Sequence, residues 1–287
     1  MSVISSYHNG NAAVHLYEDG TRVIQYEDEL HLEWPLNIDI KVSSKCSLGC
    51  SFCHESNNVD GKECDYAALK LKLYDLPKGI ELAIGSNEFT EGLYDFLIWC
   101  KLKGFVSNLT INQGHIKRDK KLLNQGIVYG LINGLGISYR SNFKWDVPES
   151  IIDYSNTVVH TIAGIDSIDD VIKLKDRGVR KLLVLGEKNF GCNTGKVDLT
   201  SQLHKEWYWW VHKLFDIFEV VSFDNLALEQ LNIKRFLTQD KWDEFWQGEH
   251  SFYLNAVEGY FAPSSRSNDK MNWDIFTIPE YFRLNEM

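Results

Sequence analysis

Short apolar runs alternate with amphipathic segments along most of this chain, and the alternation predicts its fold class. Six runs are typical of buried strands: Leu36–Val42, Gly79–Ile84, Ser107–Asn112, Gly136–Tyr139, Thr157–Ile162 and Lys181–Leu185. The segments between them are typical of helices, at Tyr66–Tyr74, Glu91–Lys103, from Lys117 onward and at Ile168–Arg177. Strands and helices that alternate at this spacing predict βα units, a parallel sheet and therefore an α/β fold.

Both ends of the chain depart from this alternation. Apolar residues on either side of Asp19-Gly20 predict a β-hairpin over residues 13–26. After Thr200, one helical face gathers Leu203, Trp207, Trp210, Val211, Leu214, Ile217 and Phe218, which we expect to be core residues. Later segments predict a helix at Asp240–Gln247 and strands at Phe252–Leu254 and Tyr260–Ala262. We therefore divide the chain into an N-terminal β-hairpin extension (1–35), an α/β core (36–222) and a mixed C-terminal extension (223–287).

Composition and charge narrow the range of partners. The 287 residues are 44% hydrophobic and 24% charged, as in an ordinary globular protein. The formal charge of −10 argues against a broad electrostatic contact with nucleic acid or anionic lipid. No apolar run reaches the roughly 18 residues of a membrane span, and the N-terminus does not resemble a signal peptide. The six cysteines do not form a disulfide pattern, so we expect a reduced, cytoplasmic setting.

Three cysteines carry the strongest chemical signal in the chain. Cys46, Cys50 and Cys53 are spaced C-x3-C-x2-C directly after the first predicted strand. Three thiolates in one loop can hold three corners of a cubane iron–sulfur cluster and leave the fourth iron open to a small molecule. The same cysteines with His54 also suit zinc, and a group of reduced thiols without metal is a further alternative.

The cysteine spacing resembles that of the radical S-adenosylmethionine (radical SAM) superfamily, and further motifs follow in the same order. Gly85-Ser86-Asn87-Glu88 follows the second strand, where relatives carry a Gly-Gly-Glu-like motif. Asn112 follows the third strand, and Ser138 and Arg140 lie at the end of the fourth. The resemblance covers roughly residues 36–191. It implies a partial (β/α)6 TIM-like barrel with its cofactors at the C-terminal strand ends.

The resemblance also assigns roles to individual residues. Cys46, Cys50 and Cys53 hold a [4Fe-4S] cluster, and its open iron binds the methionine part of S-adenosylmethionine (SAM). The SAM ammonium lies against Gly85, Ser86, Asn87 and Glu88. Asn112, Ser138 and Arg140 contact the ribose or the methionine carboxylate. Phe52 and Ile162 pack against the adenine. The implied reaction is reductive cleavage of SAM to a 5′-deoxyadenosyl radical, which abstracts hydrogen from a substrate.

The substrate is less well defined by the sequence. Cys64, Cys100 and Cys192 lack the spacing of an auxiliary cluster, and the chain resembles compact radical SAM proteins predicted on phage genomes. We expect an oxygen-sensitive enzyme that acts on a small nucleotide-like or amino-acid-like molecule and takes electrons from a donor such as flavodoxin or ferredoxin. Tyr139, Glu187 and Lys188 are candidate catalytic groups facing that substrate. The alternatives are rearrangement of SAM itself, modification of a peptide or protein side chain, and a zinc- or cluster-bearing binding protein without turnover.

Overall fold

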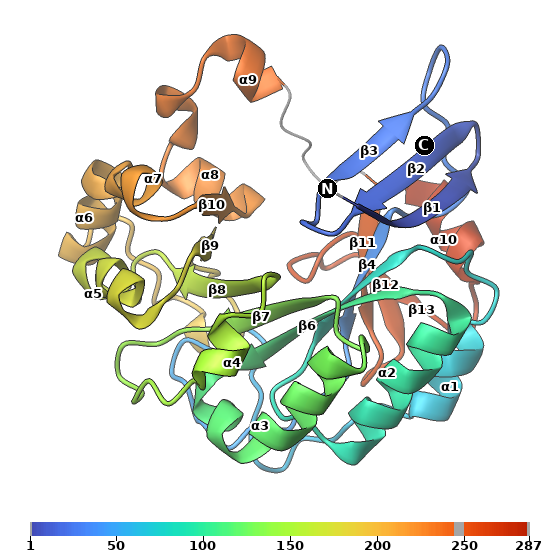
Figure 1. The fold of residues 1–287 in the computed structure, drawn as a ribbon, viewed down its shortest axis with the longest axis horizontal. Helices are drawn as coiled ribbons and strands as arrows, with labels where there is room; N and C mark the ends of the chain where they lie inside the picture. Colours follow the sequence, from blue (N-terminus) through green and yellow to red (C-terminus); the bar gives the residue numbers. More distant parts are fainter. Residues whose placement is uncertain (1, 244–249, 286–287) are drawn as a thin grey trace.

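A large, mostly parallel sheet organises the structure (Figure 1). The computed structural model describes residues 2–243 and 250–285. Within them the sheet has ten strands in the order β10-β9-β8-β7-β6-β5-β4-β11-β12-β13, and the strands from β10 to β11 are parallel. The strand bounds are β4 Asn37–Lys41, β5 Glu81–Gly85, β6 Val106–Asn112, β7 Gly134–Ser138, β8 Thr157–Ile162, β9 Lys181–Leu185, β10 Val220–Phe223, β11 Ser251–Asn255, β12 Tyr260–Ala262 and β13 Met271–Asn272. The α/β class predicted from the sequence is confirmed.

The two faces of this sheet differ in chemistry because successive residues of a strand point to opposite sides. On one face, side chains such as Ile40, Ile84 and Val184 are buried in the hydrophobic core. The other face, called the polar face below, carries Asp39, Ala83, Asn108, Thr110, Gly136 and His160 at the alternate positions. The apolar face fixes the register of the strands, and the polar face leaves polar side chains available for a ligand.

Helices cover the apolar face and connect the strands. Figure 1 shows α1, α2 and α3 side by side on this face of the sheet. The helix bounds are α1 Tyr66–Lys72, α2 Glu91–Lys103, α3 Gln113–Val128, α4 Glu149–Ile152, α5 Ile168–Ile172, α6 Gln202–Trp210, α7 Lys213–Ile217, α8 Asn225–Gln230, α9 Gln239–Asp243 and α10 Ile278–Asn285. Helix α2 begins at an N-cap, Thr90, and ends at Gly104, which has a φ of 83°. Both residues are typical of the helix boundaries that they occupy.

A small N-terminal sheet of three strands packs near the N-terminal ends of the large sheet's strands. Its strands are β1 Val3–Asn9, β2 Ala12–Tyr17 and β3 Arg22–Gln25. Arg22 forms an ion pair with Glu81 at the start of β5, and Asn156, just before β8, donates a hydrogen bond of 2.7 Å to the carbonyl of Glu18. A cavity of about 570 Å³ lies between the two sheets, and Gly136 and His160 of the polar face contribute to its lining.

Several sequence predictions differ from the structure. The predicted hairpin corresponds to β2 and β3, but β1 was not predicted because its pattern mixes polar and apolar residues. Helix α3 begins at Gln113, four residues before the predicted start at Lys117, because Asn112 caps it. The predicted helical face after Thr200 is divided between α6 and α7, and Trp210 is 46% exposed rather than part of the core.

The C-terminal part of the chain joins the large sheet. β11 pairs with β4 in parallel, so the predicted C-terminal extension continues the sheet of the predicted core. The predicted boundary at residues 222/223 falls inside β10. Of the helix expected at Asp240–Gln247, α9 covers the beginning, and residues 244–247 lie outside the described residues. No helix in the described part of the chain is long and apolar enough to cross a membrane.

Candidate active site

The three cysteines of the C-x3-C-x2-C pattern lie in a loop that follows β4 at the C-terminal edge of the parallel strands. Backbone hydrogen bonds hold this loop together: the amide of Cys46 donates to the carbonyl of Asn58 at 2.8 Å, and the amide of Cys53 donates to that of Cys50 at 3.1 Å. Cys46 is buried, whereas Cys50 and Cys53 are partly exposed. The loop therefore presents thiols at the edge where ligands bind in open α/β sheets.

The donor set suits a soft metal centre, although its atoms do not converge on one point. Burial raises the pKa of Cys46 and Cys50, and the charge of Cys53 lies close enough to both thiols to raise their pKa further. In residues 2–243 and 250–285, no three His, Cys, Asp or Glu side chains already form a metal-binding group. Thiolate ligands select zinc or iron–sulfur clusters, so the chemistry of Cys46, Cys50 and Cys53 fits the cluster that the resemblance implies.

A second loop, after β9, packs directly against the cysteine loop. The amide of Cys192 donates a hydrogen bond of 2.9 Å to the carbonyl of Cys53. Gly191 has a φ of +62°, and a Cβ atom there would lie 2.3 Å from the carbonyl oxygen of His54. Only glycine permits this backbone conformation together with such a close approach. The approach links the end of β9 to the position of Cys53.

His115 is a neighbour of the cysteines that the sequence analysis did not identify. It lies in the first turn of α3, is buried, and places Nε2 3.7 Å from the Sγ atom of Cys46. Burial lowers the pKa of His115, which favours the neutral ring with a single N–H group. A hydrogen bond to a ligand sulfur is one of the features that adjust the potential of a cluster. No local pattern marks His115, because it lies between the end of β6 and the charged run that begins at Lys117.

The Gly85–Glu88 segment lies at the end of β5, as predicted, and three of its side chains already form polar contacts within the protein. The carboxylate of Glu88 lies 3.5 Å from the guanidinium of Arg118, and the hydroxyl of Ser86 donates to the carbonyl of Glu88 at 2.7 Å. Asn87 accepts a hydrogen bond of 3.2 Å from the side chain of Asn57. Glu88 is close enough to Cys46 for its charge to raise the thiol pKa. This segment therefore borders the cysteine loop.

Arg140 is the predicted site residue with the most distinctive surroundings. Its guanidinium carbon lies 4.6 Å from the centre of the Phe52 ring, and one terminal nitrogen lies 3.7 Å from Asp166 Oδ2. Burial lowers the pKa of Arg140, and the charges of Asp166, Cys50 and Cys53 oppose this effect. Within the described residues, Nε of Arg140 and Oδ2 of Asp166 have no hydrogen-bond partner. A buried pair with such incomplete bonding is suited to a further polar ligand.

Gln113 fixes the backbone on which Arg140 stands. Its side-chain oxygen accepts a hydrogen bond of 3.0 Å from the amide of Arg140, and its Nε2 donates to the carbonyls of Arg140 and Phe143, both at 3.1 Å. The neighbouring Asn112 is used as the N-cap of α3, where its side chain accepts a hydrogen bond from Gly114. Sequence analysis singled out Asn112, but the structure gives Gln113 the contacts that position Arg140.

Phe52 and Ile162, the two residues expected to contact adenine, line the same small cavity. Lys188 and His54 also line it, so the cysteine loop meets the ends of β8 and β9 there. The volume of this cavity is about 30 Å³, which leaves room for only a few water molecules. An adenine ring would therefore enter only if one of the surrounding loops moved.

The other predicted residues are divided between packing and polar contacts. Tyr139 is buried in the hydrophobic core, with its ring 5.9 Å from that of Trp145, whereas Ser138 is partly exposed at the end of β7. The carboxylate of Glu187 accepts a hydrogen bond of 2.9 Å from Asn193 and lies 3.6 Å from Nε2 of His204. These contacts give Tyr139 a packing role and tie Glu187 to neighbouring side chains.

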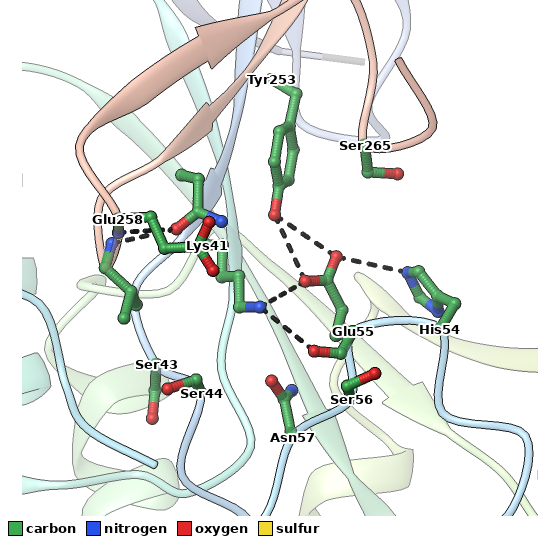
Figure 2. A network of polar contacts seen from close by, with 12 residues as sticks. Lys41, Ser43, Ser44, His54, Glu55, Ser56, Asn57, Tyr253, Glu258 and Ser265 are labelled. Carbon is green, nitrogen blue, oxygen red and sulfur yellow. Dashed lines mark hydrogen bonds and ion pairs between the residues drawn. The ribbon is translucent and has the colours of Figure 1, made fainter. Parts of the chain in front are cut away.

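A polar network adjoins this cavity on the β4 side (Figure 2). At its centre is Glu55, whose carboxylate accepts a hydrogen bond of 2.5 Å from Lys41 and bonds of 3.3 and 3.4 Å from the Tyr253 hydroxyl. His54 Nε2 lies 3.4 Å from the same carboxylate. The hydrogen bond from His54 and the charge of Lys41 outweigh the effect of burial and lower the pKa of Glu55 to about 2. His54 thus faces Glu55, and the described contacts do not bring it to the cysteines as a fourth zinc ligand.

Comparisons with known proteins add no assignment to this geometry. No known protein-family profile matches the chain, and no curated protein matches it.

Proposed function

We propose that this chain is a radical SAM enzyme that binds a [4Fe-4S] cluster through Cys46, Cys50 and Cys53 and acts on a small molecule. When bound, such a cluster supplies the electron that cleaves SAM to a 5′-deoxyadenosyl radical, which removes a hydrogen atom from the substrate. The proposal keeps the fold that the resemblance implies: β4–β9 correspond to the six strands of the partial (β/α)6 barrel, and β10 and β11 extend it at the two edges.

The observation that carries the proposal is the contact between Arg140 and Phe52. These residues come from different parts of the chain, yet both were expected to contact SAM, and the guanidinium lies 4.6 Å from the ring centre. Arg140 is also close enough to Cys50 and Cys53 to be influenced by their charges. A buried cation beside an aromatic ring and two thiols is suited to a ligand with both an anionic group and a flat ring system.

The surrounding residues have defined roles in this proposal. Arg140, positioned by Gln113, attracts the carboxylate of the SAM methionine, and the Gly85–Glu88 segment accepts its ammonium. Phe52 and Ile162 form the two sides of an adenine site. His115 donates a hydrogen bond to Cys46 and moderates the charge on that sulfur. The partly exposed Cys50 and Cys53 lie on the side open to an electron donor such as flavodoxin or ferredoxin.

The polar face provides the space for a substrate. The cavity of about 570 Å³ lies within the range of small-molecule sites. Its lining runs along β6, β7 and β8 toward the edge that carries Arg140, with Thr110, Gly136 and His160 among its residues. An enclosed small molecule therefore fits the arrangement better than an extended peptide, because ordering a flexible chain on this face has a larger entropic cost.

Metal analysis of anaerobically purified protein tests the proposal directly. We expect about four irons and four sulfides per chain, and a reduced sample that converts SAM to 5′-deoxyadenosine. Cys46→Ala, Cys50→Ala and Cys53→Ala should each abolish SAM cleavage. Cys192→Ala is the matched control, since Cys192 is exposed on the adjacent loop and lies outside the motif.

The outcomes separate the alternatives. One zinc per chain with no iron after reconstitution would overturn the proposal, and loss of that zinc in His54→Ala or His115→Ala would identify its fourth ligand. A new SAM-derived product in the absence of any other molecule would indicate that SAM is its own substrate. Formation of 5′-deoxyadenosine only with the macromolecular fraction of a cell extract would indicate a peptide or protein substrate.

A further inference from the structure

Lys188 carries a positive charge that the described residues leave without an ion-pair partner. Its Nζ atom contacts two groups, the hydroxyl of Ser265 at 3.1 Å and Nε2 of His54 at 3.3 Å. Asp224 is the acidic group with the largest effect on its pKa, but that carboxylate accepts hydrogen bonds from the amides of Gly186 and Ala227. Lys188 also lines the small cavity next to Phe52. Its ammonium is therefore placed beside the proposed cofactor site and can bind an additional anionic group.

Asp39 carries the complementary negative charge. It lies in the middle of β4 on the polar face, where its neighbours in register are Ala83 of β5 and Tyr253 of β11. The carboxylate forms no hydrogen bond or ion pair with any part of the chain that the structure describes. Desolvation by the surrounding protein raises the pKa of Asp39 to about 6, and the positive charge of Lys188 partly opposes this effect. The Asp39 side chain is exposed on the polar face, so its carboxylate is open to an incoming cation.

The two charges influence each other without forming a pair. Each appears among the groups that shift the other's pKa, yet their charged atoms are more than the 4.0 Å of an ion pair apart. The acidic and basic side chains that influence Lys188 are Asp224, Glu55, Asp39 and Arg266. Lys41, which pairs with Glu55, and Lys188 itself complete the set of charged groups in this region. The acidic and basic side chains are then equal in number, so the region favours a ligand without net charge over a polyanion.

We propose that Asp39 and Lys188 form a substrate subsite for the α-ammonium and α-carboxylate of an amino acid or amino-acid-like molecule. Asp39 accepts hydrogen bonds from the ammonium, and Lys188 and the Ser265 hydroxyl donate to the carboxylate. Ala83, the neighbour of Asp39 on β5, lines the large cavity, so the body of the ligand extends into that space. This subsite rests on the proposed function, because it names the substrate class of the same enzyme.

A nucleotide is a poorer match for these groups. Its phosphate would interact favourably with Lys188, but the carboxylates of Asp39, Glu55 and Asp224 would repel it, and it offers no ammonium to Asp39. A zwitterionic ligand satisfies both unpaired charges at once. Asp39 therefore favours an amino acid over a nucleotide, because only the amino acid brings an ammonium group to its carboxylate.

Binding measurements on the anaerobic full-length protein test the subsite without requiring turnover. The probes are the twenty proteinogenic L-amino acids, measured by calorimetry without SAM or reductant, and a set of nucleoside monophosphates. We expect at least one amino acid to bind, and Lys188→Met and Asp39→Asn each to weaken it by about tenfold or more. Lys120→Gln, which removes a positive charge from an exposed position of α3 on the other side of the sheet, is the matched control and should leave the affinity unchanged.

Analogues of the bound amino acid with one charge removed distinguish direct contact from a structural effect. The decarboxylated amine should bind weakly and be insensitive to Lys188→Met, and the N-acetyl derivative should be insensitive to Asp39→Asn. Lys188→Arg should retain part of the affinity, which keeps the test valid if Lys188→Met fails to fold. Binding of nucleotides but no amino acid, or equal loss for both analogues in both variants, would overturn the subsite. SAM cleavage without any amino-acid binding would overturn the subsite alone, and amino-acid binding without a cluster would overturn the proposed function alone.

Discussion

The guanidinium carbon of Arg140 lies 4.6 Å from the centre of the Phe52 ring, and this contact joins the end of β7 to the cysteine loop. An arginine over an aromatic face gains a cation–π attraction, and burial strengthens that attraction because water screens it less. The contact places a cation beside two of the three thiols of the motif. It therefore links the metal-binding part of the proposed site to its ligand-binding part.

Removal of the Arg140 side chain should weaken SAM binding. We expect Arg140→Ala to cost about 2–3 kcal/mol of binding free energy, measured by anaerobic calorimetry, because a charge-assisted hydrogen bond to the SAM carboxylate is lost. Glu88→Gln should cost less, because backbone carbonyls of the same segment also accept hydrogen bonds from the SAM ammonium. The Glu88 carboxylate is in addition already close to Arg118. Lys144→Ala, an exposed lysine nearby in the chain, is the control. Unchanged SAM affinity in folded Arg140→Ala would show that the cofactor binds elsewhere.

Gln113 should contribute to stability through the backbone at Arg140. In Gln113→Ala, the amide of Arg140 and the carbonyls of Arg140 and Phe143 lose their partner. Buried polar groups without partners cost about 1–3 kcal/mol, so urea denaturation should show a decrease of that size in the free energy of unfolding. Lys120→Ala, an exposed substitution in the same helix, should have little effect. Equal stability of the two variants would mean that water replaces the Gln113 amide.

The contact between Gly191 and the cysteine loop predicts a specific cost for an added methyl group. Gly191→Ala and Gly195→Ala both introduce a side chain at positive φ, and this conformation alone costs about 1–2 kcal/mol. Only at Gly191 does the new Cβ meet backbone atoms of His54 and Cys53, whereas no atom lies within 4 Å of it at Gly195. We expect Gly191→Ala to be the less stable variant and to retain less iron. Similar iron content in both variants would contradict a role of this contact in shaping the cysteine loop.

Asp39 predicts a pH dependence of stability with a definite sign. Desolvation by the surrounding protein raises its pKa from 3.8 to about 6 in the folded chain, and the positive charge of Lys188 only partly opposes this. Between about pH 4 and pH 6 the folded state therefore binds more protons than the unfolded state, and stability falls as the pH rises. Asp39→Asn removes this loss, so the variant should be more stable than the wild type above pH 6.

The measurement is thermal unfolding of both proteins across this pH range. The difference between them should shrink below pH 4, where the wild-type carboxyl is protonated in both states. Asp269→Asn, at an exposed carboxylate, is the control. A variant that is less stable than the wild type at neutral pH would indicate that the Asp39 carboxylate has a stabilising partner.

The parts of the fold that were predicted correctly are those with a strong local pattern. The strands at Thr157–Ile162 and Lys181–Leu185 match the predicted bounds because both segments are short and rich in β-branched and apolar residues, which favour buried strands. The helix at Glu91–Lys103 also matches, since its cap and its terminal glycine mark both ends. β1 was missed because its polar residues are exposed and its stability comes from pairing with β2. Pairing between strands is not visible in a local pattern of residues.

The sequence by itself determined the α/β alternation, the reduced thiols and their spacing, because each of these is a property of a short stretch of chain. The tertiary structure alone decided which distant residues meet. The pairing of β11 with β4 places Tyr253 beside Glu55, and the order β9-β8-β7 brings Lys188, Ile162 and Arg140 to one edge. Among the residues that the structure describes, it also leaves Asp39 and Lys188 without ion-pair partners. Periodicity records which face of an element is buried, whereas contacts between elements depend on strand order and packing, which no local pattern contains.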